Sequence, residues 1–597
     1  MDTIITQVTS NIAKRSMARR QAYLKRVEKQ LQQGPNRSSL ACSNLAHTVS
    51  VCAASKKDTV LDLTKISMGI ITAYNDMLSA HQPYERYPDM IRNEMSKLGH
   101  SAMVAGAVPA MCDGVTQGQD GMDISMYSRD LIAQATAVGL SHNTFDCVAL
   151  LGICDKIAPG QIMGALSFGH LPACFLPSGP MPTGISNEEK VKIRQQHVAG
   201  EVDDKALLNM ECGAYHSPGT CTFFGTANTN QLVFEAMGLM LPGSAFVPVT
   251  SELRHQLNLL AIQNMVAVSG SSASSRPLAK VVDEKAIVNS LVALIASGGS
   301  TNHTIHMIAV ARAAGFIVTW DDFDALSNVV PQLAKVYPNG PADINCFQQA
   351  GGVPTLMKML ADRDLIHMDA TPIYGTMQDY LSIPQLDDGD VIFQPVINSN
   401  DPEVIAPNGC EFNIRGGLKV LSGNLGRGVM KVSAVAKENQ VITAPAVVFD
   451  SQYDVTRAYE NGELYKDSVV VVRHNGPAAN GMPELHKLMP VLGNVMKRGF
   501  KTALLTDGRL SGASGKVPAL IHLTPEAEHG GPISKIQDGD IITINGLTGE
   551  VSVDADLDCR KQSNVDQTDL HYGSGRELFN IFRRNISSAE MGATILD

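Results

Sequence analysis

The sequence predicts an α/β fold, with a large N-terminal α/β domain on a mostly parallel sheet and a smaller β-rich C-terminal domain. At 597 residues the chain is too long for one ordinary hydrophobic core. Strand-like apolar runs alternate with helical patterns in the first half, as they do around parallel sheets. Beyond residues 374–401, where aspartates lie among prolines, strand patterns crowd together. We therefore expect a helical segment at 1–65, the α/β domain at 66–385 and the β-rich domain at 395–597.

The N-terminal half begins with a basic segment. Residues 12–33 carry many Lys and Arg side chains but no continuous apolar core, which predicts an exposed helix and not a signal peptide. The alternation that follows predicts strands at 67–73, 102–108 and 145–153, and helices at 82–98, 131–140 and 188–204. Such an alternation places the loops that carry function along one edge of the sheet.

The C-terminal domain is predicted from short strand patterns with few helices between them. The strands are expected at 446–449, 468–473, 501–506, 541–544 and 550–553. One clear helix is expected at 483–498. Closely spaced strands of this kind indicate a domain dominated by β structure.

Composition and charge exclude several classes of protein. The chain is 44% hydrophobic and 18% charged, with a net charge of −11, which describes a soluble globular protein. No basic stripe is present, so nucleic acid is not an expected partner. No apolar run reaches the roughly 18 residues that a membrane helix requires. An acidic protein can still bind a phosphorylated substrate through a local basic pocket or helix N-termini.

The cysteines indicate a reducing compartment. Eleven of them are spread thinly along the chain, and none forms a C-x-x-C pair. This spacing gives no support to a zinc ribbon, a thioredoxin-type site or a disulfide framework. We therefore expect the protein to be cytoplasmic.

One stretch concentrates reactive side chains. Cys154, Asp155 and Lys156 follow an apolar run at 148–153 and precede Pro159. This pattern predicts a buried strand that ends in a loop, where α/β proteins bind ligands. A thiolate is a soft ligand for iron, a carboxylate is a hard ligand for magnesium, and a lysine near a metal can change its protonation state. The residues alone favour the plainer alternative of a strand end with a buried thiol and a solvated Asp–Lys pair.

A second stretch, residues 503–514, is another strand that runs into a Gly/Ser loop. Together the two stretches resemble the paired signatures of the dihydroxy-acid dehydratase and 6-phosphogluconate dehydratase family. Residues 74–84, 108–118 and 421–427 are similar to its 6-phosphogluconate branch. The resemblance extends from about residue 41 to the C-terminus. It implies a swivelling β/β/α C-terminal domain that closes over the N-terminal domain, and a homodimer.

The resemblance implies an iron–sulfur-dependent hydro-lyase of the Entner–Doudoroff pathway. Its substrate would be the phosphorylated sugar acid 6-phospho-D-gluconate, and its products 2-dehydro-3-deoxy-6-phospho-D-gluconate and water. Cys154 and Cys221 match the family's cluster cysteines, and the branch implies a [4Fe-4S] cluster. The sister branch has another cysteine in an early loop, but residues 76–81 contain none here. Cys112 is the candidate third ligand, and a buried free thiol is the alternative for it.

A magnesium ion is a further possibility. Asp113, Asp155 and Lys156 align with positions that hold magnesium in the sister branch, where the third acidic ligand is a glutamate. Its counterpart here is Asn475, which can coordinate through its carbonyl oxygen but adds no charge. The alternative is that Asp113, Asp155 and Lys156 orient the substrate directly.

Ser511 matches the base that is proposed for the family. A serine can act as a base only as an alkoxide, stabilised by nearby positive charge from a metal, Lys156 or Arg509. The glycines at 508 and 512 would allow the tight turn that this requires, although a simple Gly/Ser turn also explains the pattern. Two alternative functions stay open: dehydration of another sugar acid or a dihydroxy acid, and a non-enzymatic iron–sulfur sensor.

Overall fold

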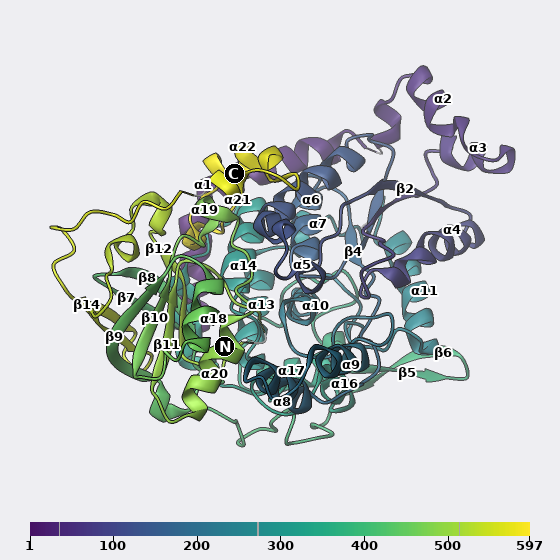
Figure 1. Cartoon of the computed structure of the whole chain (residues 1–597). Helices are drawn as coiled ribbons and strands as arrows, with labels where there is room; N and C mark the ends of the chain where they lie inside the picture. Colours follow the sequence, from purple (N-terminus) through teal and green to yellow (C-terminus); the bar gives the residue numbers. More distant parts are fainter. Residues whose placement is uncertain (35, 271–273, 513, 567, 597) are drawn as a thin grey trace.

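The computed structural model describes residues 1–34, 36–270, 274–512, 514–566 and 568–596. An α/β part, drawn in purple to teal in Figure 1, lies beside a closed β-barrel drawn in green to yellow. The predicted fold class is therefore confirmed. Residue 513, in the predicted Gly/Ser loop, lies outside the described residues. Within those ranges, no helix combines the length and the apolar character that crossing a membrane requires.

The N-terminal part is built on a parallel sheet. Its strands run in the order β2-β1-β3-β4 and are β1 (Ser67–Thr72), β2 (Ser101–Ala107), β3 (Cys147–Leu151) and β4 (Ala173–Phe175). Strands β1, β3 and β4 are buried along their whole length, which suits their continuous apolar sequences. Strand β1 pairs with β2 on one side and with β3 on the other. The carboxyl edge of β1 is therefore the switch point at which α/β sheets commonly bind their ligands.

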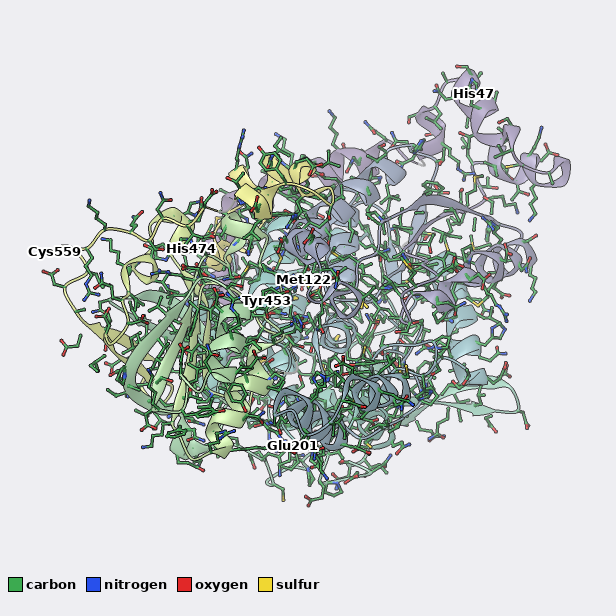
Figure 2. All side chains as sticks on the ribbon, viewed as in Figure 1. His47, Met122, Glu201, Tyr453, His474 and Cys559 are labelled. Carbon is green, nitrogen blue, oxygen red and sulfur yellow. The ribbon has the colours of Figure 1, made fainter. Side chains whose placement is uncertain are left out.

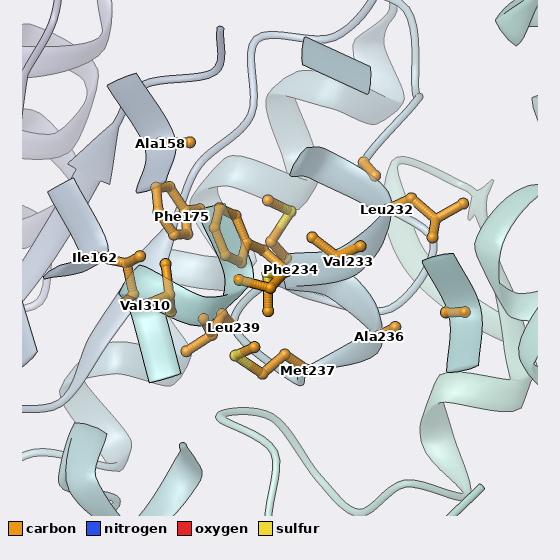
Figure 3. Close-up of a cluster of buried hydrophobic side chains, with 14 of the residues drawn as sticks. Ala158, Ile162, Phe175, Leu232, Val233, Phe234, Ala236, Met237, Leu239 and Val310 are labelled. Carbon is orange, nitrogen blue, oxygen red and sulfur yellow. The ribbon is translucent and has the colours of Figure 1, made fainter. Parts of the chain in front are cut away.

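Helices pack on this sheet and on one another. Those in contact with the sheet are α4 (Tyr87–Lys97), α6 (Ser125–Leu140), α7 (Ile157–Leu166) and α11 (Glu252–Ala267). The core continues through α10 (Thr226–Ala236), α13 (Glu284–Ser297) and α14 (His303–Ala313). Figure 3 shows its centre, where the ring of Phe175 stacks on that of Phe234 with centroids 5.1 Å apart.

The remaining helices of this part lie around the core. They are α5 (Asp113–Thr116), α8 (Asn187–Val198), α9 (Asp204–Ala214), α12 (Leu278–Val281), α15 (Trp320–Val329), α16 (Ile344–Gln349) and α17 (Gly352–Ala361). The predicted helix at 188–204 corresponds to α8, which ends at residue 198, and α9 begins only at residue 204.

The N-terminal helix differs from the exposed helix that the sequence predicts. Helix α1 (Thr3–Gln32) begins earlier and buries one face, including Ile5, Val8 and Ile12, in the main core. These residues recur at helical spacing, but they precede the basic stretch that begins at Lys14, on which the prediction of an exposed helix rests. Helices α2 (Cys42–Ser50) and α3 (Ala54–Leu61) project from the body of the molecule (Figure 1).

The C-terminal part is a closed barrel in the order β10-β11-β12-β8-β7-β14-β13-β9. Its strands are β7 (Leu418–Gly423), β8 (Gly426–Lys431), β9 (Val441–Phe449), β10 (Ser468–Val472), β11 (Thr502–Thr506), β12 (Ala519–Thr524), β13 (Ile541–Asn545) and β14 (Glu550–Asp554). The sequence predicts β9, β10, β11, β13 and β14 but misses the other three. Strands β7 and β8 contain or adjoin Gly423, Gly426 and Gly428, and glycine weakens the strand signal.

Strand β10 explains why a barrel strand can be entirely apolar. Val469 and Val471 point into the barrel core, whereas Val470 and Val472 pack beneath α18 (Gln452–Glu460) and α20 (Leu488–Lys497) outside it. Side chains alternate across a strand, so both faces are buried. Helix α20 begins later than the predicted helix at 483–498, which leaves residues 483–487 in a loop that faces the N-terminal part.

Two segments join the parts. The hairpin of β5 (Ser382–Asp387) and β6 (Asp390–Pro395) follows the last N-terminal helix. After the barrel come α21 (Thr568–His571) and α22 (Asn580–Asn585). The chain then returns to the N-terminal core. There, Arg129 Nη2 donates to the carbonyl oxygens of Gly592 and Ala593 at 2.9 and 2.6 Å. At the junction, Tyr453 of α18 lies near Asp123, the neighbour of Met122 (Figure 2).

Candidate functional site

The predicted site residues meet where the carboxyl edge of the N-terminal sheet faces the barrel. Cys112 and Asp113 follow β2, and Cys154, Asp155 and Lys156 follow β3. Arg509 and Ser511 follow β11, which is parallel to β10. Loops that follow parallel strands gather at the carboxyl edge of their sheet. The site forms where the carboxyl edge of the N-terminal sheet meets that of the parallel strands of the barrel.

Two buried cations bridge two carboxylates. Lys156 Nζ lies 2.5 Å from Asp113 Oδ1 and 2.7 Å from Asp155 Oδ2. Arg509 reaches across from the barrel, with Nη2 2.6 Å from Asp113 Oδ2 and Nη1 3.2 Å from Asp155 Oδ2. Both cations are fully buried, and charges this deep are tolerated only when paired and hydrogen-bonded. The pairs therefore tie the two parts together at the site.

We call Asp113, Asp155, Lys156 and Arg509, with the side chains that join them, the ion cluster. Three further residues belong to it, and sequence reasoning missed all of them. Glu484 Oε2 lies 3.5 Å from Arg509 Nη1, and its other oxygen accepts a 3.0 Å hydrogen bond from Gln117. His306 Nε2 lies 3.2 Å from Asp155 Oδ1. Ser125 Oγ donates to Asp113 at 2.8 Å. The one available signal was for Glu484, an acidic residue in a Gly/Pro-containing loop after a buried strand.

Asn475, the predicted counterpart of the acidic ligand in the sister branch, makes its contacts within its own loop. Its Nδ2 donates to the Arg473 carbonyl at 2.7 Å, and its Oδ1 accepts from Asn480 at 3.4 Å. The Asn475 backbone N–H donates to Asp507 Oδ1 at 3.0 Å. Asn475 thus shapes the loop after β10, and Glu484, nine residues later, supplies the acidic side chain that joins Asp113 and Asp155.

The carboxyls of the ion cluster differ in acidity. Burial alone would raise the pKa of Asp155, but the charges of Lys156 and Arg509 and the hydrogen bond with His306 hold it well below its usual range. Burial and the nearby Asp113 raise the pKa of Glu484 to about 7, and Arg509 only partly opposes them. Asp155 therefore remains ionised near neutral pH, whereas Glu484 can take up or release a proton. Carboxyl groups whose pKa values are pushed apart mark acid–base sites.

The structure also brings the three predicted thiols together. Cys112 and Cys154 share a side-chain hydrogen bond, which lowers the pKa of Cys112 to about 7 and raises that of Cys154. Burial, reinforced by the charge of Cys112, raises the pKa of Cys221 to about 12. We call Cys112, Cys154 and Cys221 the thiol trio. All of it comes from the N-terminal part.

Soft donors of this kind suit iron. In the described ranges, no three His, Cys, Asp or Glu side chains converge closely enough to hold a single metal ion. An iron–sulfur cluster sets a different requirement, because its cysteines bind separate irons and so stand apart. The thiol trio, in which Cys154 is buried and Cys112 and Cys221 are half-buried, offers three such donors from separate loops.

Ser511 is half-buried in a tightly packed loop. A Cβ on Gly512 would lie 2.4 Å from Ser300 Oγ and 2.8 Å from the Thr226 backbone nitrogen. A Cβ on Gly508 would lie 2.9 Å from that of Asn475. Neither glycine has a positive φ. The loop does turn at this point, with the Ser514 N–H donating to the Ser511 carbonyl at 2.9 Å, and the two glycines allow close approach between segments.

Comparison with known proteins places these residues in a family context. The model described as dihydroxy-acid/6-phosphogluconate dehydratase N-terminal matches residues 65–380, and its C-terminal counterpart matches 403–593. A protein of Escherichia coli (strain K12) named phosphogluconate dehydratase is 54% identical over 100% of both chains. A Pseudomonas aeruginosa protein of the same name is 51% identical over 99% of this chain and 98% of its own. A dihydroxy-acid dehydratase of Ignicoccus hospitalis is 32% identical over 81% of this chain and 86% of its own. The chain belongs to the dihydroxy-acid/6-phosphogluconate dehydratase family.

Proposed function

We propose that the protein dehydrates 6-phospho-D-gluconate to 2-dehydro-3-deoxy-6-phospho-D-gluconate and water, a step of the Entner–Doudoroff pathway. The observation that carries the proposal is the meeting of the thiol trio, the ion cluster and the Ser511 loop at one junction. The full-length similarity to proteins named phosphogluconate dehydratase supports this substrate over a branched-chain dihydroxy acid.

The reaction has two difficult parts. The C2 proton is weakly acidic, and hydroxide is a poor leaving group, so the site must provide a base, charge stabilisation and a Lewis acid. When bound, a [4Fe-4S] cluster would supply the Lewis acid for the C3 hydroxyl. Cys112, Cys154 and Cys221 would hold it, and three thiolates would leave one of its irons without a cysteine ligand.

The chain's own residues supply the remaining chemistry. Ser511 takes the C2 proton, while Lys156 and Arg509 provide positive charge for the substrate carboxylate and the developing enolate. Asp155 stays ionised and holds both cations in position. Glu484, with a pKa of about 7, holds a proton that it can give to the departing hydroxide. The enol then tautomerises to the ketone.

A magnesium ion is not part of this proposal, because the ion cluster does not fit one. Asp113 and Asp155 have the oxygen donors that magnesium prefers. However, the ammonium of Lys156 and the guanidinium of Arg509 already bridge these two carboxylates. The two cations therefore act on the substrate directly.

The proposal includes a cytoplasmic homodimer. Support for a dimer comes from the exposed apolar side chains of Val104 on β2 and Val138 on α6, which are 38% and 66% exposed beside the edge of the sheet. All eleven cysteines are free thiols, as expected in a reducing compartment. Light scattering on the purified protein should give twice the chain mass.

The test is an anaerobic reconstitution with iron and sulfide, followed by an assay for 2-keto acid. The substrates are 6-phosphogluconate, unphosphorylated gluconate and a branched-chain 2,3-dihydroxy acid. We expect turnover of 6-phosphogluconate alone, and only in the reconstituted protein. Preferred turnover of either control acid would overturn the substrate assignment, and an intact cluster without any turnover would favour the sensor alternative.

A further inference from the structure

Lys431, the last residue of β8, is a buried amine outside the ion cluster. It is 6% exposed, and its Nζ has no hydrogen-bond partner among the described residues. Lysine is almost never buried without a partner, because the charged form loses its hydration and gains nothing in return. Burial without a counter-charge therefore favours the neutral amine, whose nitrogen lone pair can accept a proton.

The Lys431 side chain lines a small cavity together with Ser511. The cavity measures about 10 Å³, and Thr301 and Ser514 add hydroxyl groups to its wall. This volume is close to the room that one water molecule needs. Gly515 lies beside the Lys431 stem, since a Cβ built there would make ordinary contact with Lys431 Cδ at 3.6 Å. Lys431 and Ser511 thus line the same small space.

The titratable side chains of the neighbouring strands and of the loop after Ser511 have partners of their own. On the neighbouring strand β7, Lys419 pairs with Asp324 at 3.0 Å. Arg427 of β8 pairs with Glu590 at 2.8 Å. On β12, His522 Nδ1 lies 3.4 Å from Thr304 Oγ1, and in the loop after Ser511, Lys516 lies over the Tyr337 ring at 6.0 Å. Burial alone accordingly lowers the pKa of Lys431 to about 7.

Lys156 provides a contrast within the same site. Two carboxylates lie 2.5 and 2.7 Å from its Nζ, so Lys156 is held in ion pairs. Lys431 has the opposite surroundings, with hydroxyl groups and apolar side chains. Neutral lysines are known general bases, and serine–lysine pairs activate serine in other enzymes.

We propose that Lys431 accepts the proton of Ser511 and thereby makes Ser511 a base. This role rests on the proposed dehydration. The Nζ lone pair takes the Ser511 Oγ–H proton, and Oγ takes the C2 proton of the substrate. The C2–H electron pair forms the C2=C3 bond while the C3–O bond breaks and hydroxide leaves. The hydroxide gains a proton to become water, and the Lys431 ammonium returns its proton to solvent. Because Lys431 acts only through Ser511, it is a positioning residue.

The experiment compares Lys431→Met and Lys431→Gln with the wild-type enzyme, all reconstituted with iron and sulfide. Losing the acceptor should lower kcat about 10²–10⁴-fold, the usual range for general base assistance. In the wild type, kcat/KM should fall below about pH 7 as Lys431 becomes protonated, and this acidic limb should vanish in both variants. Lys419→Met, a lysine change on the neighbouring strand, should leave kcat and the acidic limb unchanged.

A double variant separates this role from a structural one. Ser511→Ala with Lys431→Met should be no slower than Ser511→Ala alone, because residues that act as a unit are not additive. Additive losses, or an acidic limb that persists in Lys431→Met, would overturn the proposal. Equal turnover by the wild type and Lys431→Met would overturn the role of Lys431 but not the proposed dehydration. No turnover by the wild type would overturn the proposed dehydration as well.

Discussion

The thiol trio and the ion cluster are neighbours in sequence, yet they are assembled differently. Cys112 adjoins Asp113, and Cys154 adjoins Asp155. The trio takes all its members from the N-terminal part, whereas the ion cluster needs Arg509 and Glu484 from the loops of the barrel. Cofactor binding should therefore depend on one part of the molecule, and acid–base chemistry on the docking of both.

The two regions also differ in electrostatics. The hydrogen bond with Cys112, together with burial, raises the pKa of Cys154, and burial raises that of Cys221. These thiols therefore lose their protons only at a free-energy cost that a bound metal would offset. In the ion cluster, Lys156 and Arg509 already balance the charges of Asp113 and Asp155. The trio is thus arranged for an added cationic group, and the ion cluster is pre-organised.

The largest effect is expected from the thiol trio. Cys154→Ser and Cys221→Ser should abolish both iron binding and turnover, because serine replaces a soft thiolate with a hard hydroxyl. Iron and sulfide analysis after anaerobic reconstitution checks this. Cys212→Ser, which changes an exposed thiol, is the matched control and should leave both quantities unchanged. Wild-type iron content in the Cys221→Ser variant would refute the ligand assignment.

The ion cluster should respond differently. Arg509→Met removes the buried cation that contacts Asp113, Asp155 and Glu484 together, and it leaves Lys156 in place. Losing one partner of a buried pair costs about 3–5 kcal/mol. We expect that loss in denaturant unfolding, with turnover abolished and iron content kept. Arg457→Met removes an arginine that is 71% exposed and pairs with Asp454 on the surface, so it should change neither stability nor turnover. Unaltered stability of Arg509→Met would contradict the bridging role.

A smaller effect is expected from the packing that joins the parts. In Gly512→Ala, the new methyl would meet Ser300 Oγ at 2.4 Å and the Thr226 nitrogen at 2.8 Å. Overpacking of this kind costs about 1–3 kcal/mol, and it should also displace Ser511. Thermal unfolding and kcat measure the two effects. In Gly121→Ala, where the nearest atom is at 3.7 Å, both should stay at wild-type values.

The smallest effect concerns pH. The pKa of Glu484 is raised in the folded state to about 7, so the folded protein binds its proton more tightly than the unfolded chain does. This contribution to stability is present below the pKa of unfolded glutamate and is lost as pH rises through about 7. Glu484→Gln should therefore flatten the fall in unfolding free energy across that window, as measured in denaturant titrations at several pH values. An unchanged slope would show that Glu484 does not hold a proton there.

The sequence predicts much of the N-terminal half of the site, for a physical reason. Continuous apolar runs specify strands that are buried on both faces, and the residues after them must lie at the carboxyl edge. Cys154, Asp155 and Lys156 were found in this way. Ser511 and Arg509 follow the same kind of pattern, although family resemblance was needed to assign their roles.

The residues that sequence reasoning missed depend on long-range geometry. Glu484, His306 and Ser125 enter the ion cluster only after loops distant in sequence have packed together. Lys431 lies on a strand whose glycine-rich hairpin conceals the alternation of side chains, so nothing local marks its burial. Asn475 is predicted from its place in a local motif, and such a motif does not show that Glu484, nine residues later, reaches Arg509.

The most direct test of this account measures turnover and bound iron on the same samples of wild-type protein, Cys221→Ser and Arg509→Met. We predict that Cys221→Ser loses both, whereas Arg509→Met keeps the wild-type amount of iron and loses turnover. An Arg509→Met variant that loses iron in parallel with turnover would contradict the claim that cofactor binding and acid–base chemistry rest on different parts of the molecule.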